Sequence, residues 1–326
     1  VVGVMGCSDD DEVEVEVVWK LATYTTEGDT ITDICHNFAE KVKELSDGRM
    51  EIEVHAGDLY TGGDSFDGVS QGVVEMAVCP SSWYFGKMPQ TAASLGTTWD
   101  LDPQKLLLAR KAIVAEFAGA ITEAADNDIM HTLWISAGYV DFCFDRDVRV
   151  LADLEGLNIG SSSTTVNAIT GGDAMKANPV EVQQADVYLA AESGQIDGAM
   201  LPVANYVSIS LYEVLPHLVL TKCFPTVFST LMNASAYEEL DADLQEVVDE
   251  AAAEAEADGI AADATDFEQA LDDIELEGGH VYELPTSEQE TWFDSAIWPV
   301  FVGMLNGMLG ADGFATVQDI VDDAIA

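Results

Sequence analysis

The stretch from Gly138 to Asn205 carries two units of strand, loop and helix in direct succession. A turn at Gly156 leads into a short apolar strand in which Leu157 and Ile159 point the same way, and this strand ends in the Ser/Thr-rich loop 161–165. A second helix and a second strand end follow, and that strand also runs into a loop, which contains proline. Because open α/β sheets bind ligands where their strands end, the pattern predicts one wall of a cleft for a small molecule.

The first eighty residues show the same alternation of strands and helices. Apolar strand patterns at 17–23, 50–57 and 73–79 are separated by a helical pattern at 31–45 and by a shorter one at 66–71. In the longer helix, apolar residues recur three, four and seven positions apart, which predicts one buried face. The order strand, helix, strand, helix, strand predicts parallel strands that are joined by crossover helices.

Two later features predict a second lobe. A helical stretch at 103–126 and a strand at 131–136 lead the chain to Gly138, where we expect the first crossing between lobes. A strand at 225–230 precedes an Ala-rich helical pattern of about ten turns, which starts near Asp243. One helix of this length would extend beyond a single lobe, and a chain of 326 residues is long enough to form two hydrophobic cores.

Acidic residues dominate the charge of the chain. Its 60 Asp and Glu stand against 12 Lys and Arg, which gives a formal net charge of −48. A field of this sign repels phosphates and anionic lipids and excludes nucleic-acid binding. The repulsion would be screened when the Debye length falls to about 3 Å near 1 M salt, so the charge fits a saline habitat. A solvated surface without environmental meaning stays open as the second explanation.

The five cysteines show no CxxC pair and no spacing typical of metal ligands. Cys35 and Cys79 lie in apolar patterns, and we expect both to be buried thiols. Cys7 follows an apolar run and precedes an acidic spacer, and the residues VMGC at 4–7 resemble the end of a bacterial lipoprotein signal. We expect a lipid on Cys7 to tether the protein, because no run of about 20 apolar residues is present to span a membrane.

The chain shows none of the residue patterns that catalysis requires. We find no nucleophile beside a base and no paired carboxylates in an apolar setting, and the motifs HExxH, GxSxG and GxxxxGK(S/T) are absent. The five His residues are scattered, and the neighbours Cys35 and His36 point apart on a helix, so they would not share a metal ion. The sequence predicts a binding protein without metal or cofactor, and not an enzyme.

Aromatic and polar side chains beyond the strand ends are the candidate ligand contacts. Trp83 and Tyr84 follow an apolar strand, where they would form a binding platform or pack as core and rim. The hydroxyls of the loop 161–165 predict a hydrogen-bonding cradle at a helix N-terminus, with an ordinary polar turn as the alternative. Lys20 and Lys87 are further candidates. The predicted ligand-binding residues are Tyr24, Trp83, Tyr84, Tyr139, Gly160, Ser161, Ser163, Gln184, Leu201 and Asn205.

The order of these segments closely resembles that of the solute-binding proteins of TRAP (tripartite ATP-independent periplasmic) transporters. The resemblance covers nearly the whole chain after the acidic spacer and implies an α/β, two-lobed periplasmic-binding-protein-like fold with a long connecting helix. It is carried by WKLA at 19–22, FAEKVKELSDGRMEIEV at 38–54, VEMA at 74–77, DLEGLNI at 153–159 and ADVYLAAESGQIDGA at 185–199.

The resemblance also implies a domain division and a function. The division is a signal remnant and acidic spacer at 1–16, a first lobe of 17–137 plus 226–265, and a second lobe of 138–225 plus 266–326. The implied function is to capture a small organic solute in the periplasm or at the cell surface and to deliver it to an ion-gradient-driven TRAP membrane permease. Two alternatives stay open: a ligand-sensing subunit for a membrane receptor, and an enzyme on a binding-protein fold.

Two positions depart from the family pattern. In most of the family, the strand written here as GLNIG ends in an arginine whose guanidinium binds the ligand's carboxylate, and Gly160 stands there in this chain. A second family arginine, near Val140, is also absent. A carboxylate would then rest on residues 161–165, Lys20 or Lys87; otherwise the ligand is neutral or cationic, which the aromatic side chains slightly favour. We expect Gly160→Arg to improve the binding of at least one carboxylate.

Cys7 provides the first testable prediction. When the protein is expressed with its full signal in a bacterial host, it should partition into the detergent phase because of its lipid, and Cys7→Ala should stay in the aqueous phase. Cys35→Ala removes a thiol that we expect to be buried, so it should partition like the parent protein. Equal detergent partitioning of Cys7→Ala and the parent would contradict the lipoprotein assignment.

Overall fold

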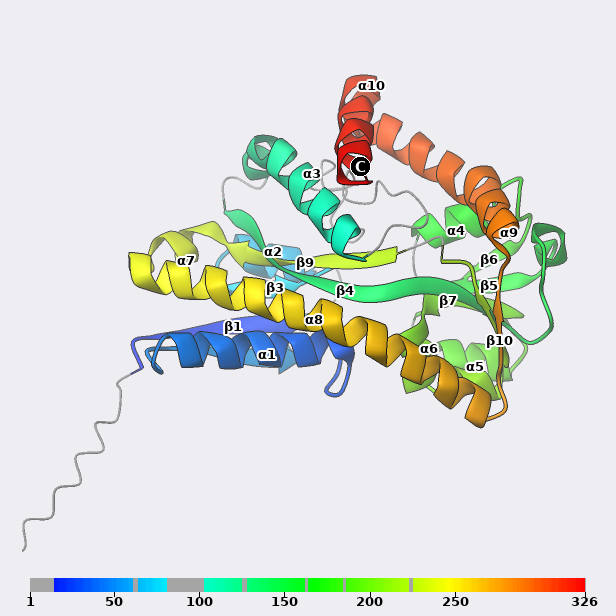
Figure 1. Cartoon of the computed structure of the whole chain (residues 1–326), viewed down its shortest axis with the longest axis horizontal. Helices are drawn as coiled ribbons and strands as arrows, with labels where there is room; N and C mark the ends of the chain where they lie inside the picture. Colours follow the sequence, from blue (N-terminus) through cyan, green and yellow to red (C-terminus); the bar gives the residue numbers. More distant parts are fainter. Residues whose placement is uncertain are drawn as a thin grey trace, which may run out of the picture.

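The computed structural model describes residues 15–60, 64–80, 103–124, 128–161, 164–183, 186–222 and 225–325 (Figure 1). These residues form two α/β lobes, which lie side by side and are joined by one long helix and one long strand (Figure 1). Some residues singled out above lie outside the described ranges, namely Cys7, Trp83, Tyr84, Lys87, Ser163 and Gln184.

The first lobe begins with three parallel strands and two crossover helices. Strand β1 (Val17–Thr23) pairs in parallel with β2 (Met50–Ala56) and with β3 (Met76–Val78). Helices α1 (Thr30–Leu45) and α2 (Asp64–Ser70) make the connections between them. The alternation that the sequence predicts for this part of the chain is therefore confirmed.

One face of α1 packs into the core of this lobe. Asp29 caps the helix, because its side chain accepts a hydrogen bond of 3.0 Å from the backbone N–H of Ile31. Full burial of a large apolar side chain stabilises a fold by about 1.5 to 3 kcal/mol. The cluster that α1 shares with the long helix α8 (Ala242–Leu276) contains Ile34, Cys35, Phe38, Val42, Leu244, Val248 and Ala251.

Strand β4 (Ile129–Phe144) runs through both lobes. Its first part pairs antiparallel with β9 (Pro225–Asn233) in the first lobe, and its last five residues pair with β7 (Gly198–Pro202) in the second lobe. The sequence predicts a strand that stops before a loop at Gly138, whereas the structure continues the strand through that point. Register shifts at Leu133 and near Gly138, both with positive φ, absorb the change of direction.

The second lobe is built on a mixed sheet around the end of β4. Strands β7, β5 (Asn158–Ser161) and β6 (Asn178–Glu181) lie in this order on one side of β4, and the neighbouring strands are parallel from β7 to β6. On the other side, β8 (His217–Leu220) pairs with β4 and also with β10 (His280–Glu283).

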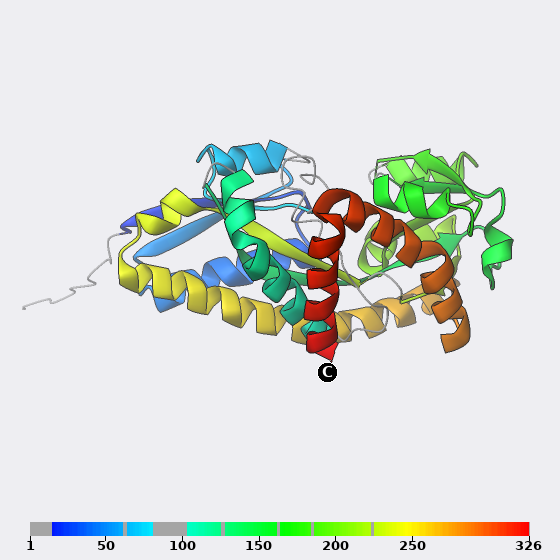
Figure 2. The same cartoon turned by 90° about the horizontal axis from the view of Figure 1, so that it is seen from above.

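Helix α8 connects the lobes along their whole length (Figures 1 and 2). Its 35 residues correspond to a rod of about 52 Å, which is longer than a single lobe of this size requires. The buried carboxylate of Glu256 on this helix accepts a hydrogen bond of 2.8 Å from the backbone N–H of Trp134, beside the first register shift of β4, and contacts the ammonium group of Lys111. The long connecting helix predicted from the sequence is therefore confirmed.

Most of the helices before the C-terminal ones are short. Those in and near the second lobe are α4 (Thr164–Thr170), α5 (Val187–Glu192), α6 (Val203–Ser208) and the 3-10 turns Leu151–Leu154 and Leu211–Glu213. In the first lobe, α7 (Ala234–Glu238) follows β9, and α3 (Pro103–Ala124) covers part of the sheet.

The C-terminal helices contact both lobes. Helix α9 (Thr286–Trp292) continues through a π-helical turn into α10 (Trp298–Ile325), which breaks at Gly310 (φ 70°). Phe301, before the break, lies in the core of the second lobe, whereas Val317, after it, packs with residues of α3 in the first lobe (Figure 2). The division of the chain into lobes stays a prediction, and the end of α10 adds a further connection between them.

The same C-terminal stretch, Thr286–Asp323, is long and apolar enough to cross a membrane by length and composition. Its most apolar 18-residue window has a mean hydropathy of 1.3, and 17% of that window is buried. The sequence analysis above did not predict such a stretch. Core helices of water-soluble proteins meet the same criterion, and here Trp292, Phe301 and Val321 are packed in hydrophobic clusters.

A buried carboxylate organises the return of the chain from the second lobe to the first. Asp141 on β4 is fully buried, and its Oδ1 accepts hydrogen bonds from the backbone N–H groups of Thr221 (2.7 Å) and Lys222 (3.1 Å) just after β8. Its Oδ2 has no hydrogen-bond partner among the described residues. Burial raises the pKa of Asp141 to about 6, although these hydrogen bonds act in the opposite direction.

Asp141→Asn should change how stability depends on pH. Because the folded pKa lies above the unfolded value of 3.8, the stabilisation from proton binding is fully present below about pH 4 and is lost as the pH rises through 6. Between about pH 4 and 7, the stability of Asp141→Asn should therefore increase relative to that of the parent by about 3 kcal/mol in the free energy of unfolding. Its melting temperature should rise relative to that of the parent over the same range.

Asp173→Asn is the matched control, because it removes the same charge from an exposed position. Thermal unfolding followed by circular dichroism at a series of pH values gives the melting temperatures of the parent and of both variants. A constant difference between Asp141→Asn and the parent across this range would contradict the raised pKa.

Candidate functional site

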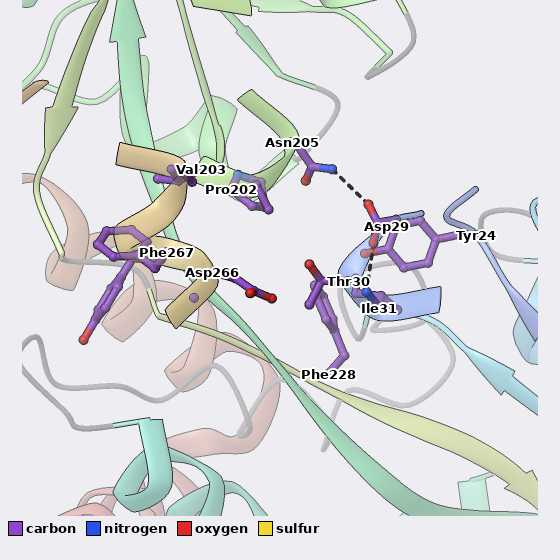
Figure 3. Close-up of a pocket in the computed structure, with 14 residues that line it drawn as sticks. Tyr24, Asp29, Thr30, Ile31, Pro202, Val203, Asn205, Phe228, Asp266 and Phe267 are labelled. Atoms are coloured by element: carbon purple, nitrogen blue, oxygen red, sulfur yellow. Dashed lines mark hydrogen bonds between the residues drawn. The ribbon is translucent and has the colours of Figure 1, made fainter. Parts of the chain in front are cut away.

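A pocket opens where the two lobes meet (Figure 3). The empty space between its walls is about 560 Å³ when open solvent is included, and the part that the centre of a water molecule can occupy is about 50 Å³. Its walls come from the loop after β1, the start of α1, the middle of β4, the β7–α6 junction, β9 and α8. The lining residues are Tyr24, Asp29, Thr30, Ile31, Gly138, Tyr139, Pro202, Val203, Ala204, Asn205, Phe228, Asp266, Phe267 and Ala270.

The location of the pocket follows from the topology. Strand β1 ends at Thr23 in the first lobe and β7 ends at Pro202 in the second, and each strand passes directly into a lining segment. In α/β folds, the carboxyl ends of strands leave room for ligands because the following loops turn away toward their helices. Here the strand ends of two separate sheets meet at one pocket.

Two aromatic pairs frame the pocket. Tyr24 and Phe228 lie edge to face, with ring centroids 6.2 Å apart and planes at 75°. Tyr139 on β4 and Phe267 on α8 make a similar contact at 6.4 Å and 64°. Both distances lie in the range in which aromatic pairs attract each other, so the two rings of each pair favour these orientations.

Asp29 and Asn205 connect the lobes across the pocket. While Oδ1 of Asp29 caps α1, its Oδ2 accepts a hydrogen bond of 3.4 Å from Nδ2 of Asn205 on α6 (Figure 3). Burial raises the pKa of the Asp29 carboxyl, and the neighbouring Asp33 adds to this effect, whereas hydrogen bonds from Ile31, Asn205 and Thr25 oppose it. A second carboxylate, that of Asp266 on α8, lines the same pocket and is exposed.

Three of the predicted ligand contacts lie in this pocket, namely Tyr24, Tyr139 and Asn205. The others that the structure describes are buried and do not line it. Leu201 belongs to the apolar core beside α6, and Ser161 is 7% exposed at the end of β5. Ser161 and Thr165, which are described residues of the predicted cradle at 161–165, do not line this pocket.

Among the pocket residues that the sequence analysis did not single out as ligand contacts are Asp29, Phe228, Asp266 and Phe267. Two of them carry a signal in the sequence. Asp29 directly precedes the apolar helical pattern of α1, where an Asp is a strong capping residue, and Phe267 is the one aromatic residue of α8. An aromatic ring in so polar and Ala-rich a helix marks a position where the helix touches something other than solvent.

Gly160 lies against an apolar cluster of the second lobe. A Cβ atom at this position would come within 2.9 Å of Cδ1 of Ile196 and 3.6 Å of a methyl group of Val182. Both residues belong to the apolar core of the second lobe. A side chain at position 160 would first meet this core, and Gly160 is not among the residues that line the pocket. The expectation that Gly160→Arg improves the binding of a carboxylate stays a prediction, and the substitution also has a cost in packing.

The basic side chains of the described chain lie away from the pocket. Lys20 is exposed on β1, where its backbone N–H donates to the carboxylate of Glu75. Arg110 is buried on α3, and its burial lowers its pKa to about 9. Neither residue lines the pocket, and the described lining contains no Lys, Arg or His.

A second hollow lies on the second lobe beside β8 and β10. It contains His217 and His280, which are directly paired across the two strands with ring centroids 5.0 Å apart, together with Asp147, Arg149 and Glu275. The guanidinium of Arg149 lies over the ring of Tyr282. Among the described residues, no three His, Cys, Asp or Glu side chains come together in a way that could hold a metal ion.

Gly160→Arg should destabilise the protein. The new side chain has to displace Ile196 and bring a charge against an apolar core, and overpacking alone costs about 1 to 3 kcal/mol. Gly303→Arg is the control, because a Cβ at Gly303 meets no atom within 4 Å. Thermal unfolding should show a large loss for Gly160→Arg and a small one for Gly303→Arg. Unchanged stability together with improved binding of succinate would show that the arginine reaches the pocket instead.

Comparisons with known proteins agree on the family and the fold. The family model for bacterial extracellular solute-binding proteins, family 7 (DctP), matches residues 21–300. A solute-binding protein of Sulfitobacter sp. (strain NAS-14.1) is 27% identical over 252 residues, which cover 76% of this chain and 74% of that protein. Solved structures with the same overall fold agree with this match.

A TRAP periplasmic solute binding protein from Desulfovibrio desulfuricans with bound sn-glycerol-3-phosphate has a TM-score of 0.83 at 21% identity, covering 95% of this chain and 97% of that chain. The extracytoplasmic solute receptor DctP7 of Bordetella pertussis, which binds pyroglutamic acid, has a TM-score of 0.81 at 22% identity, covering 94% and 99%. Because the family model spans most of the chain, this protein belongs to bacterial extracellular solute-binding protein family 7, the TRAP solute-binding family that its sequence resembles.

Proposed function

We propose that the protein captures a small organic solute outside the cytoplasm and delivers it to an ion-gradient-driven TRAP membrane permease. The observation that carries this proposal is the pocket between the lobes, whose walls come from both lobes and from the strand and helix that join them. A site of this construction encloses its ligand when the lobes approach each other. Membership of the solute-binding family supports the same function.

The connections between the lobes support a closing motion. The continuous segments are β4 with its register shifts, the link from β8 to β9, helix α8 and the break of α10 at Gly310. Bulges and positive-φ glycines can absorb a rotation over a few residues, while the packed cores of the lobes stay rigid. The hydrogen bond between Asp29 and Asn205 then forms or breaks as the lobes move, so this contact couples closure to the contents of the pocket.

The solute itself is proposed to be neutral or cationic. The two structural neighbours named above hold molecules with acidic groups, pyroglutamic acid and sn-glycerol-3-phosphate. The described lining contains no basic side chain, and Gly160 and Val140, which stand where the family resemblance puts ligand-binding arginines, do not line this pocket. Burying a carboxylate without a cation or several hydrogen-bond donors costs more than the about 1 to 3 kcal/mol that an unpaired neutral polar group costs in proteins.

A lipid on Cys7 is the proposed anchor. The acidic spacer at 8–16 would let the lobes move above the membrane surface and reach the permease. The partners of the protein are then the small-molecule ligand and the permease subunits, with contact to the membrane through the anchor.

Ligand capture can be tested in two steps. A thermal-shift screen over ammonium compounds, neutral polyols and amides, and carboxylates should find a class that raises the melting temperature, because a ligand that binds only the folded protein stabilises it. X-ray scattering should then show a smaller radius of gyration with that compound, since the lobes close on it. A compound of similar size that leaves the melting temperature unchanged is the control and should cause no compaction. Stabilisation without compaction would contradict lobe closure, and stabilisation by no class would contradict solute capture.

A further inference from the structure

The polar side chains of the pocket are unusual for a site that would hold an acid. Its charged groups are the two carboxylates of Asp29 and Asp266, and its neutral polar groups include the amide of Asn205 and the hydroxyls of Tyr24 and Tyr139. The described lining contributes negative charge and no positive charge. An anionic ligand in this pocket would be repelled from two sides.

The N-terminus of helix α1 lies at the pocket but is not free to bind an anion. The N-terminus of α1, sixteen residues long, would favour negative charge because of its exposed N–H groups and its dipole. Asp29 already occupies this position and accepts the N–H of Ile31 with Oδ1. The carboxylate is therefore a permanent part of the pocket wall, and its Oδ2 is the atom directed to the other lobe (Figure 3).

The contact of Asp29 with the other lobe is a weak one. Its Oδ2 accepts the amide N–H of Asn205 at 3.4 Å, a long contact for a charged acceptor, which usually takes its donors at 2.7 to 2.9 Å; the side chain of Thr25, on its own lobe, also hydrogen-bonds the carboxyl. Burial acts against the charged form of the carboxyl, as the raised pKa shows. A positively charged group in the pocket would remove this cost, whereas a second carboxylate would increase it.

The aromatic rings complete the requirements for a cation. Tyr24 and Phe228 line the pocket together with Asp29, and Tyr139 and Phe267 line it together with Asp266. The face of an aromatic ring attracts a cation by about 0.5 to 2 kcal/mol, and alkylated ammonium groups also gain from contact with apolar surface. Carboxylates beside aromatic rings therefore suit a ligand that carries a positive charge surrounded by apolar alkyl groups.

We propose that this pocket binds an organic cation with an ammonium group, and that Asp29 is the residue that selects for its charge. This inference rests on the proposed function and narrows the solute to one class. Asn205 acts as the neutral partner of Asp29 without ligand, and the ammonium group takes over that carboxylate oxygen in the complex. Asp266, at the exposed side of the pocket, and the net charge of −48 attract cations toward the entrance.

Calorimetry with matched compounds tests the charge preference. The panel consists of choline, tetramethylammonium and putrescine, the uncharged choline analogue 3,3-dimethyl-1-butanol, and succinate, all at the same ionic strength. At least one ammonium compound should bind. If choline binds, its uncharged analogue, which has nearly the same shape, should bind at least tenfold more weakly.

Two variants then locate the effect at Asp29. Asp29→Asn should weaken the binding of the ammonium compound at least tenfold, which corresponds to about 1.4 kcal/mol. The melting temperature of the unliganded protein should stay nearly unchanged, because Asn caps a helix as well as Asp does. Asp33→Asn removes the same charge from the same helical turn at an exposed position and should leave binding unchanged. Equal weakening by both variants would assign the effect to general attraction of cations and overturn the proposal.

The remaining outcomes separate this inference from the proposed function. Tighter binding of succinate than of every ammonium compound, or of the alcohol than of choline, would overturn the cation assignment and leave solute capture intact. Binding of an ammonium compound that Asp29→Asn does not weaken would overturn the role of Asp29. No binding by any compound of the panel would overturn the cation assignment, and the thermal-shift screen then decides about solute capture.

Discussion

The passage of β4 through both sheets is the constraint on which the rest of the structure depends. Its sixteen residues pair with β9 in one lobe and with β7 and β8 in the other, so each lobe has the same strand in its core. Where the strand bends, its hydrogen-bonded pairing with β9 is interrupted. There the buried carboxylate of Glu256 on α8 accepts a hydrogen bond from the backbone N–H of Trp134. Because a buried N–H without a partner is costly, this contact ties the long helix to the shared strand.

The pocket is a consequence of this arrangement. Strand β4 supplies Gly138 and Tyr139 at the bend, α8 supplies Asp266 and Phe267 as it crosses the junction, and the strand ends of β1 and β7 open toward the same space. The elements that connect the lobes are thus also walls of the site. A ligand in this place contacts the parts of the chain that have to bend when the lobes move, which links binding to closure physically.

Much of the fold could be predicted from the sequence, because its signals are periodic and local. Apolar spacing in 31–45 placed α1 correctly, alternation placed β1 and β2, and an Ala-rich acidic run placed α8. The site was harder to predict. Tyr24, Tyr139 and Asn205, which line the pocket, could be singled out as candidate contacts because they follow or precede strand patterns, whereas Phe228 lies within a strand and resembles an ordinary core residue. The bend at Gly138 was taken for a strand end, since a bulge and a loop share the same glycine signal.

The sequence by itself therefore determined the alternation of strands and helices, the need for two lobes, the family and the excess of negative charge. Only the tertiary structure decided which side chains share the pocket. Asp29 and Asn205 are 176 positions apart and meet because two lobes approach, and Gly160 faces Ile196 because of the register of β5 in its sheet. Periodicity follows from the backbone geometry of one element, whereas a contact between lobes depends on how separate cores are placed, and no local pattern encodes that placement.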